Sequence, residues 1–93
     1  MTKTYRFKYK KGMGLSYERQ GYIYFMCRNW NKLTDEQREK IKFCADNDAA
    51  PYGDAVLYHV TTGASLTETT AKYYLGINTL YRALEKFYKR FPL

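Results

Sequence analysis

The 93-residue chain is 45% hydrophobic and 18% aromatic, which excludes a disordered tail and predicts one folded domain. Its formal net charge of +7 at pH 7 favours a polyanionic partner, with nucleic acid ahead of an anionic membrane. No run approaches the ~18 apolar residues of a membrane span, and no signal-peptide pattern opens the chain, so we expect a cytoplasmic protein without a membrane partner.

Residues 1–14 are expected to form a basic N-terminal arm that precedes a helical domain over residues 15–93. In this arm aromatic residues alternate with the cations Arg6, Lys8 and Lys10, a pattern typical of a strand or an extended segment. Nothing later in the chain alternates in the same way, so a partner strand is lacking. We therefore favour an extended arm, whose Arg6, Lys8 and Lys10 are expected to contact a neighbouring groove or the backbone of the DNA.

Three helices are expected in the middle of the chain. Ser16 can cap the first, Thr34 and Gln37 have the spacing of a capping box at the start of the second, and Pro51 suits the first position of the third. The expected spans are about 17–31, 35–46 and 51–62. The side chains expected inside are Ile23, Met26, Cys27, Trp30, Ile41, Cys44, Ala45, Val56 and Val60.

Two further helices are expected to close the chain, over about 65–74 and 79–91. Ser65 begins a second capping-box pattern, and Pro92 stops the last helix. Asn78 can cap that helix, and Ala71, Leu75 and Ile77 are expected to pack against its inner face. The fold class is therefore all-α, a compact bundle of about five helices ending in a helix-turn-helix at about 65–91.

The last helix has two distinct faces on a helical wheel of roughly 100° per residue. Its core stripe consists of Leu80, Leu84, Phe87 and Phe91, and Tyr81 and Tyr88 are expected on an edge between core and solvent. The opposite face carries cations. The residues expected to contact DNA from this helix are Asn78, Thr79, Tyr81, Arg82, Lys86, Lys89 and Arg90. Arg82 suits the two acceptors of guanine, and the lysines suit phosphates.

The segment Leu75–Arg82, LGINTLYR, resembles the turn and recognition-helix start of helix-turn-helix domains in resolvases, transposases and sigma region-four-like regulators. Those domains typically run L-G-I-S, two further residues, then T-V-Y-R, so the turn is two residues shorter here. The resemblance covers roughly the last thirty residues and implies DNA binding by Thr79, Tyr81 and Arg82. It extends to no recombinase catalytic domain. Small basic proteins of phages and mobile elements are similar in type.

The expected function is sequence-specific binding of double-stranded DNA, as a small transcriptional regulator of a phage or mobile element. Because operators are often two-fold symmetric, a homodimer is a possible form of such a regulator. One alternative is an inhibitor that binds a host nucleic-acid machine, such as a CRISPR effector or RNA polymerase, through its many tyrosines. Another is a binder of single-stranded nucleic acid through the aromatic residues of the arm.

Catalysis is not expected. The single histidine, His59, lies among residues expected to be buried, and no third group that could orient a Cys–His pair is evident. Cys27 and Cys44 form no CxxC pair, so neither a zinc site nor a disulfide framework is predicted. No phosphate-cradling glycine motif is present, and we expect no cofactor.

Overall fold

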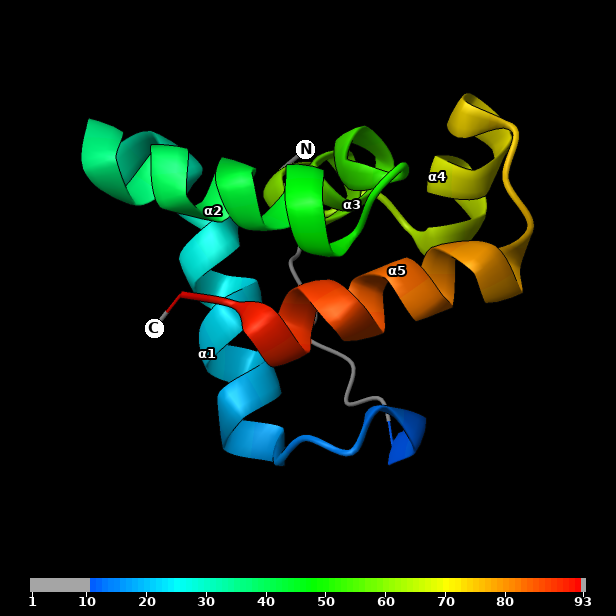
Figure 1. Ribbon diagram of the computed structural model, residues 1–93, viewed down its shortest axis with the longest axis horizontal. Coiled ribbons are helices and arrows are strands. Elements are labelled where there is room, and N and C mark those ends of the chain that lie inside the picture. The colour runs from blue at the N-terminus through cyan, green and yellow to red at the C-terminus, as the bar shows by residue number, and fades with distance from the viewer. Residues whose placement is uncertain (1–10, 93) are drawn as a thin grey trace, which may run out of the picture.

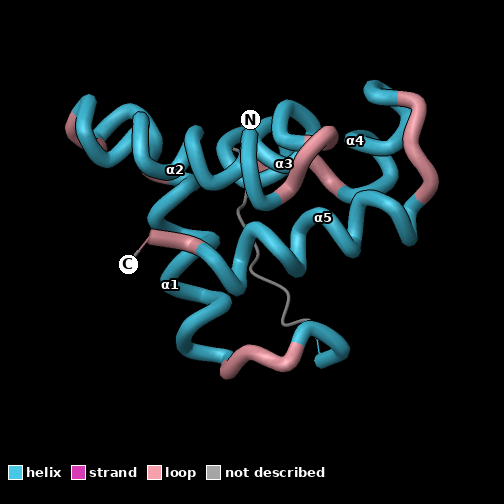
Figure 2. The backbone as a smooth tube through the Cα atoms, viewed as in Figure 1, coloured by secondary structure: helices cyan, strands magenta, loops and turns pink. Residues whose placement is uncertain are grey.

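Five α-helices and two short 3₁₀ helices make up the part of the chain that the computed structural model describes, residues 11–92 (Figure 1). The α-helices are α1 (Tyr17–Arg28), α2 (Asp35–Asp48), α3 (Gly53–Thr62), α4 (Leu66–Tyr73) and α5 (Ile77–Arg90), and the 3₁₀ helices are η1 (Lys11–Met13) and η2 (Trp30–Lys32). Figure 2 shows helices joined by short connections, with no strand over residues 11–92. The prediction of an all-α fold with about five helices is confirmed.

Side-chain caps start three of the helices where the sequence predicts them. The Ser16 hydroxyl accepts from the Arg19 N–H at 3.1 Å, and the Ser65 hydroxyl accepts from the Glu68 N–H at 3.0 Å. Thr34 and Gln37 form the full capping box, with reciprocal bonds of 3.1 and 2.8 Å. Each cap satisfies an N–H group that the helix itself leaves without a partner.

The ends of α1 and α2 and the start of α3 differ from the prediction. α1 stops at Arg28 because Asn29 turns its backbone N–H and its side-chain amide back onto the last carbonyls, so Trp30 belongs to η2. α2 continues to Asp48. α3 begins at Gly53 rather than Pro51, since the Tyr52 N–H bonds to the Ala49 carbonyl at 2.8 Å and holds residues 49–52 in a turn.

Gly53 marks a close approach between α2 and α3. A Cβ atom at this position would lie only 2.6 Å from the Ala45 carbonyl oxygen, a distance that real side chains do not adopt. The absence of a side chain at residue 53 therefore lets the start of α3 pack directly on the backbone of α2.

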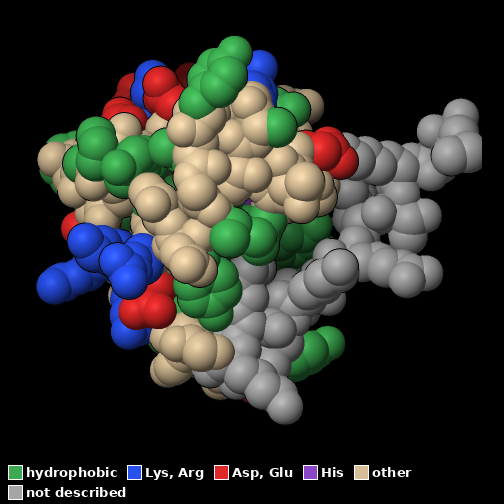
Figure 3. All heavy atoms as spheres, turned by 90° about the vertical axis from the view of Figure 1, so that its right-hand side faces the viewer, with side chains coloured by type: hydrophobic (Ala, Val, Ile, Leu, Met, Phe, Trp, Pro, Cys, Tyr) green, Lys and Arg blue, Asp and Glu red, His purple; other side chains and the backbone are tan. Residues whose placement is uncertain are grey.

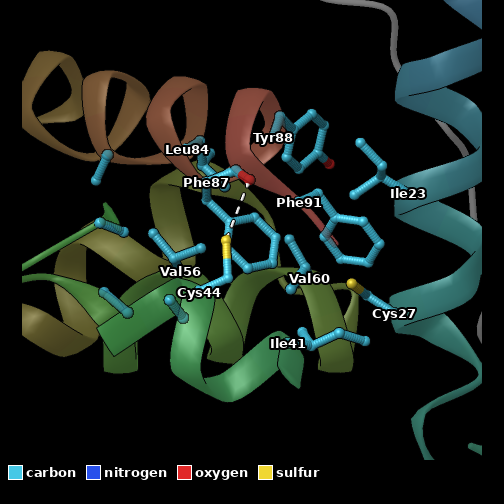
Figure 4. Close-up of a cluster of buried hydrophobic side chains, with 14 of the residues drawn as sticks. Ile23, Cys27, Ile41, Cys44, Val56, Val60, Leu84, Phe87, Tyr88 and Phe91 are labelled. Atoms are coloured by element: carbon cyan, nitrogen blue, oxygen red, sulfur yellow. Dashed lines mark hydrogen bonds between the residues drawn. The ribbon is translucent and has the colours of Figure 1, made fainter. Parts of the chain in front are cut away.

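The core lies where α5 packs against α1, α2 and α3. Leu84 and Phe87 point from α5 toward α2 and α3, Tyr88 points toward Ile23 of α1, and Phe91, just after α5, lies near Cys27 of α1 (Figure 4). The expected core residues that are buried are Ile23, Cys27, Ile41, Cys44, Ala45, Val56, Val60, Leu80, Leu84, Phe87 and Phe91, as predicted. Met26 and Trp30 are partly buried against this core.

Tyr88 corrects the expectation that it lies at the edge of the core with Tyr81. Its side chain is fully buried, because α1 covers the flank of α5 that a wheel drawn for an isolated helix leaves at the edge. Met13 is also fully buried and Leu15 packs on the same core, so the polypeptide contributes to the globule from η1 onward. The expected arm residues Arg6, Lys8 and Lys10 lie outside the described residues.

Arg28 connects the end of α1 to the end of α3. Its guanidinium donates to the Thr61 carbonyl at 2.7 Å, one of the carbonyls that a helix C-terminus leaves without an intrahelical partner. The guanidinium lies over Gly63, where a Cβ atom would be 2.8 Å from Arg28 Cζ. Gly63 also has φ of 75°, the left-handed conformation that ends α3.

Over residues 11–92, every helix is too short or too polar to span a lipid bilayer.

Replacing Phe87 by alanine is expected to lower the free energy of unfolding by about 3–5 kcal/mol, because it leaves a cavity under α5. The ring is fully buried and lies 5.5 Å, centroid to centroid, from the Phe91 ring. Urea denaturation followed by circular dichroism measures the loss. Lys86→Ala is the matched control on the exposed face of the same helix and should change stability by less than about 0.5 kcal/mol. A Phe87→Ala loss below about 1 kcal/mol would contradict the proposed packing.

Candidate nucleic-acid interface

The last two helices form a corner at one end of the molecule, joined by residues 74–76 (Figure 1). Tyr74 leaves α4 in the left-handed conformation, with φ of 56° and ψ of 45°. This reversal lets the Leu75 N–H bond to the Thr70 carbonyl at 3.0 Å, which closes the end of α4 in the manner of a Schellman motif. The three-residue connection then directs the chain into α5.

α5 begins two residues earlier than predicted, and this changes the role of Asn78. Gly76 is the N-cap residue, in an extended conformation with φ of −74° and ψ of 150°. Asn78 therefore lies inside the first turn of the helix and does not cap it. The helix starts early because the chain already leaves the left-handed conformation at Tyr74, so the turn is complete by Gly76.

The side chains that α4, the connection and α5 turn toward the core are partly different from those predicted. On α4, Thr69 is fully buried and its hydroxyl donates to the Ser65 carbonyl at 2.8 Å, whereas Ala71 is exposed. Leu75 packs against the core as expected. Ile77 is 54% exposed, which corrects the expectation that it packs inward, because as the first residue of α5 it precedes the part of the helix that the other elements cover.

The outer face of α5 carries a row of polar and cationic side chains. Asn78, Arg82, Lys86 and Lys89 are all exposed and follow one another at intervals of three or four residues. Residues at such intervals lie on one side of a helix. The opposite side is the buried stripe from Leu80 to Phe87, so packing fixes the direction in which the cations face.

Two of the three cations in this row have no acidic partner. Lys89 pairs with Glu85 one turn earlier, with 3.2 Å between Nζ and Oε1. Arg82 and Lys86 form no ion pair with any residue in the described part of the chain. Figure 3, which looks onto the corner end of the molecule, shows Lys and Arg side chains gathered at the left of the view, with an acidic side chain directly beside them.

The remaining predicted contact residues lie away from this row. Thr79 and Tyr81 are half-buried, and the Tyr81 hydroxyl lies over the backbone of Gly12, 3.3 Å from where a Cβ would stand. Arg90 lines a separate hollow of about 450 Å³ with Glu36, Glu39 and Asp48. The structure thus brings together Asn78, Arg82, Lys86 and Lys89, and it turns Arg90 toward α2.

α4 adds one cation to the corner. Lys72 is exposed, and its Nζ lies 5.1 Å from the centroid of the Tyr58 ring and 5.8 Å from that of Tyr73. A cation over an aromatic face is attracted by the ring quadrupole. The two rings therefore hold the Lys72 ammonium near the surface of α3 and α4.

A second surface feature lies on α1. Tyr17, Tyr22 and Phe25 are exposed and line a shallow hollow of about 640 Å³ together with Met26 and Leu33. Adjacent exposed aromatic side chains of this kind are favoured in protein–protein interfaces.

Burial holds the two thiols of the core in their protonated, uncharged forms. Burial raises the pKa of the Cys27 thiol to about 12, and burial with the neighbouring Asp48 carboxylate raises that of Cys44 to about 12. His59 Nδ1 lies 2.7 Å from the Ala64 carbonyl oxygen, so this nitrogen carries the proton and donates it. Among residues 11–92 no three His, Cys, Asp or Glu side chains are grouped as metal ligands.

No protein-family model, curated protein or solved structure matches this chain.

The two buried thiols make stability fall at alkaline pH. In the unfolded chain they ionise near pH 9.0, whereas in the folded protein they stay protonated up to about pH 12. Between these values the unfolded state releases the protons first, so the free energy of unfolding should fall by up to about 1.4 kcal/mol per pH unit for each thiol.

Urea denaturation of the wild type and Cys44→Ala at pH 7, 8, 9.5 and 10.5 measures this effect. The variant is expected to be less stable at pH 7 and 8 by a constant amount, because its cavity does not titrate. Above pH 9 its stability should fall less steeply than that of the wild type. Parallel curves across the whole range would contradict the raised pKa of Cys44.

Proposed function

We propose that this protein binds double-stranded DNA through the outer face of α5, as a sequence-specific regulator of the kind found in phages and mobile elements. The observation that carries the proposal is the exposed row Asn78, Arg82 and Lys86, whose cations lack acidic partners within residues 11–92. On α2, by comparison, Lys40 pairs with Glu36 one turn earlier, with 3.2 Å between Nζ and Oε1. A row left open in this way suits a polyanion.

The shape of the corner supports the same proposal. α5 has 14 residues and is therefore about 21 Å long, and a B-DNA major groove about 12 Å wide admits one α-helix. The short α4 and the three-residue connection give the pair the outline of a helix-turn-helix, in which the second helix enters the groove. In this arrangement α4 lies across the backbone, where Lys72 can pair with a phosphate.

Each residue of the row has a chemically suitable contact. Asn78, in the first turn of α5, can form two hydrogen bonds with adenine, and Arg82 can do the same with guanine. Lys86 and Lys89 lie further along the helix and suit the flanking phosphates. Lys89 would exchange its bond to Glu85 for a phosphate, so its contribution should be smaller than that of Lys86.

A protein-binding function is the second candidate, and the exposed aromatic side chains of α1 favour it. Tyr17, Tyr22 and Phe25 provide apolar area with little loss of side-chain entropy on binding, as interface anchors do. The partner would be a host protein complex or a second copy of the chain. Tyr22→Glu distinguishes this function from the first, since it should abolish a protein contact on α1 and leave duplex binding through α5 intact.

Fluorescence anisotropy with a 30-base-pair duplex at 50 and 200 mM salt tests the proposed function. If three phosphates are neutralised, the wild-type dissociation constant should rise about 40-fold over this range, because each contact contributes about 0.9 to the logarithmic slope. Lys86→Ala should reduce that slope by about 0.9. Arg82→Ala should weaken binding to a selected sequence by about 1–3 kcal/mol.

Arg90→Ala is the matched control because it removes an equal charge from the same helix but on the side that faces α2. Its duplex affinity should stay within about twofold of the wild type, since its charge is screened over a distance comparable with the Debye length. Equal losses for Arg90→Ala and Arg82→Ala would show attraction by net charge alone. Failure of the wild type to bind any duplex at 50 mM salt would refute the proposal.

A further inference from the structure

Tyr74 occupies a conformation and an environment that do not favour tyrosine. Its φ of 56° lies in the left-handed region, where glycine is the preferred residue because a Cβ atom clashes with the following carbonyl. Among residues 11–92 it is the one non-glycine residue with a positive φ. The fold requires this conformation at residue 74, since the reversal closes α4 and opens the connection to α5.

Folding does not compensate Tyr74 for this strain by burying its ring. The residue is 94% exposed, so almost none of its surface is covered by the rest of the protein. A glycine would fit the turn at least as well, and an asparagine nearly as well. The ring is therefore neither required by the turn nor used by the core, and backbone outliers of this kind cluster at active sites, ligand clamps and switch regions.

Ile77 adds a second exposed apolar side chain at the same corner. It opens α5, three residues after Tyr74, and is 54% exposed. Asn78 and Arg82 follow it directly on the outer face of the helix. The start of α5 thus presents two apolar groups immediately before the first polar groups of the row.

We infer that Tyr74 and Ile77 contact the 5-methyl groups of thymine in the major groove, next to the bases read by Asn78 and Arg82. The inference rests on the proposed function and names the base feature that this corner recognises. The thymine methyl is the apolar group that the major groove displays, and side chains with apolar surface are its usual contacts. Loss of one buried methyl corresponds to a weakening of about three- to fivefold.

The charge around the corner favours DNA over a protein as the occupant of these two side chains. Residues 64–93 contain five Lys or Arg against two Glu, and one of the two, Glu85, is paired with Lys89. Tyr74 and Ile77 are apolar side chains in a segment rich in cations. Such a surface is complementary to the DNA major groove, where the thymine methyl groups lie between two rows of phosphates. The exposed aromatic groups of α1, by contrast, lie beside the carboxylate of Glu18.

The experiment compares two duplexes that differ only in thymine methyl groups. The wild-type protein first selects a 20-base-pair duplex from a randomised library, and the same duplex is then made with every thymine replaced by deoxyuridine. Dissociation constants are measured for the wild type, Tyr74→Gly, Ile77→Ala and the double variant, with Phe43→Ala and Arg82→Ala as controls. Phe43 is 69% exposed but lies on α2, so its loss should not affect binding.

The inference predicts that the wild type binds the deoxyuridine duplex at least three- to fivefold more weakly than the thymine duplex. The double variant Tyr74→Gly/Ile77→Ala should bind the two duplexes with equal affinity. Each single variant should lose part of the discrimination. Tyr74→Gly should melt at or above the wild-type temperature, so unfolding cannot account for the result. Phe43→Ala should discriminate between the duplexes as the wild type does.

Equal binding of the two duplexes by the wild type, or a selected duplex without thymine, would overturn the inference. So would a loss in Tyr74→Gly that is the same on both duplexes. Arg82→Ala separates these results from failure of the proposed function, since it should weaken binding to both duplexes alike. If no duplex is enriched in the selection, the proposed function and this inference fail together.

Discussion

The packing of the inner face of α5 against α1, α2 and α3 is the constraint on which the other features depend. Leu84 and Phe87 bind the helix to α2 and α3, while Tyr88 binds it to α1. With one side held by three elements, α5 cannot rotate about its axis without exposing large apolar groups. The direction in which Asn78, Arg82 and Lys86 face is thus set by the core, and no contact among the polar residues is needed to fix it.

The distribution of charge follows from the same arrangement. The acidic residues of the middle of the chain lie largely on α2, where Asp35 pairs with Arg38 and Glu36 with Lys40. Arg90, on the flank of α5 nearest α2, faces carboxylates in the hollow that the two helices share. Arg82 and Lys86, which form no ion pair within residues 11–92, lie on the far side of α5. This asymmetry suits the proposed approach of a polyanion to one side of the molecule.

The sequence predicts the helices and the core well because local chemistry decides them. The hydroxyls of Ser16, Thr34 and Ser65 cap helices in any context, and the spacing of Leu80, Leu84 and Phe87 is enough to define a buried stripe. The corner was harder to predict. The end of α4 was predicted to within one residue. Tyrosine rarely adopts a left-handed conformation, so the sequence did not indicate the reversal at Tyr74 or that α5 starts before Asn78. The burial of Tyr88 depends on α1, and the orientation of Arg90 depends on α2. A helical wheel drawn for α5 alone contains neither of these neighbouring helices.

Arg28 and Gly63 are structurally coupled, so a substitution at one position requires a substitution at the other. The guanidinium occupies the space of a side chain at residue 63, and its bond to the Thr61 carbonyl depends on reaching across that glycine. A larger residue at 63 would displace the cation and leave the end of α3 without its donor. In the evolution of this chain, a glycine exchanged at residue 63 therefore calls for a compensating exchange at residue 28, and the two positions should covary although 35 residues separate them along the polypeptide.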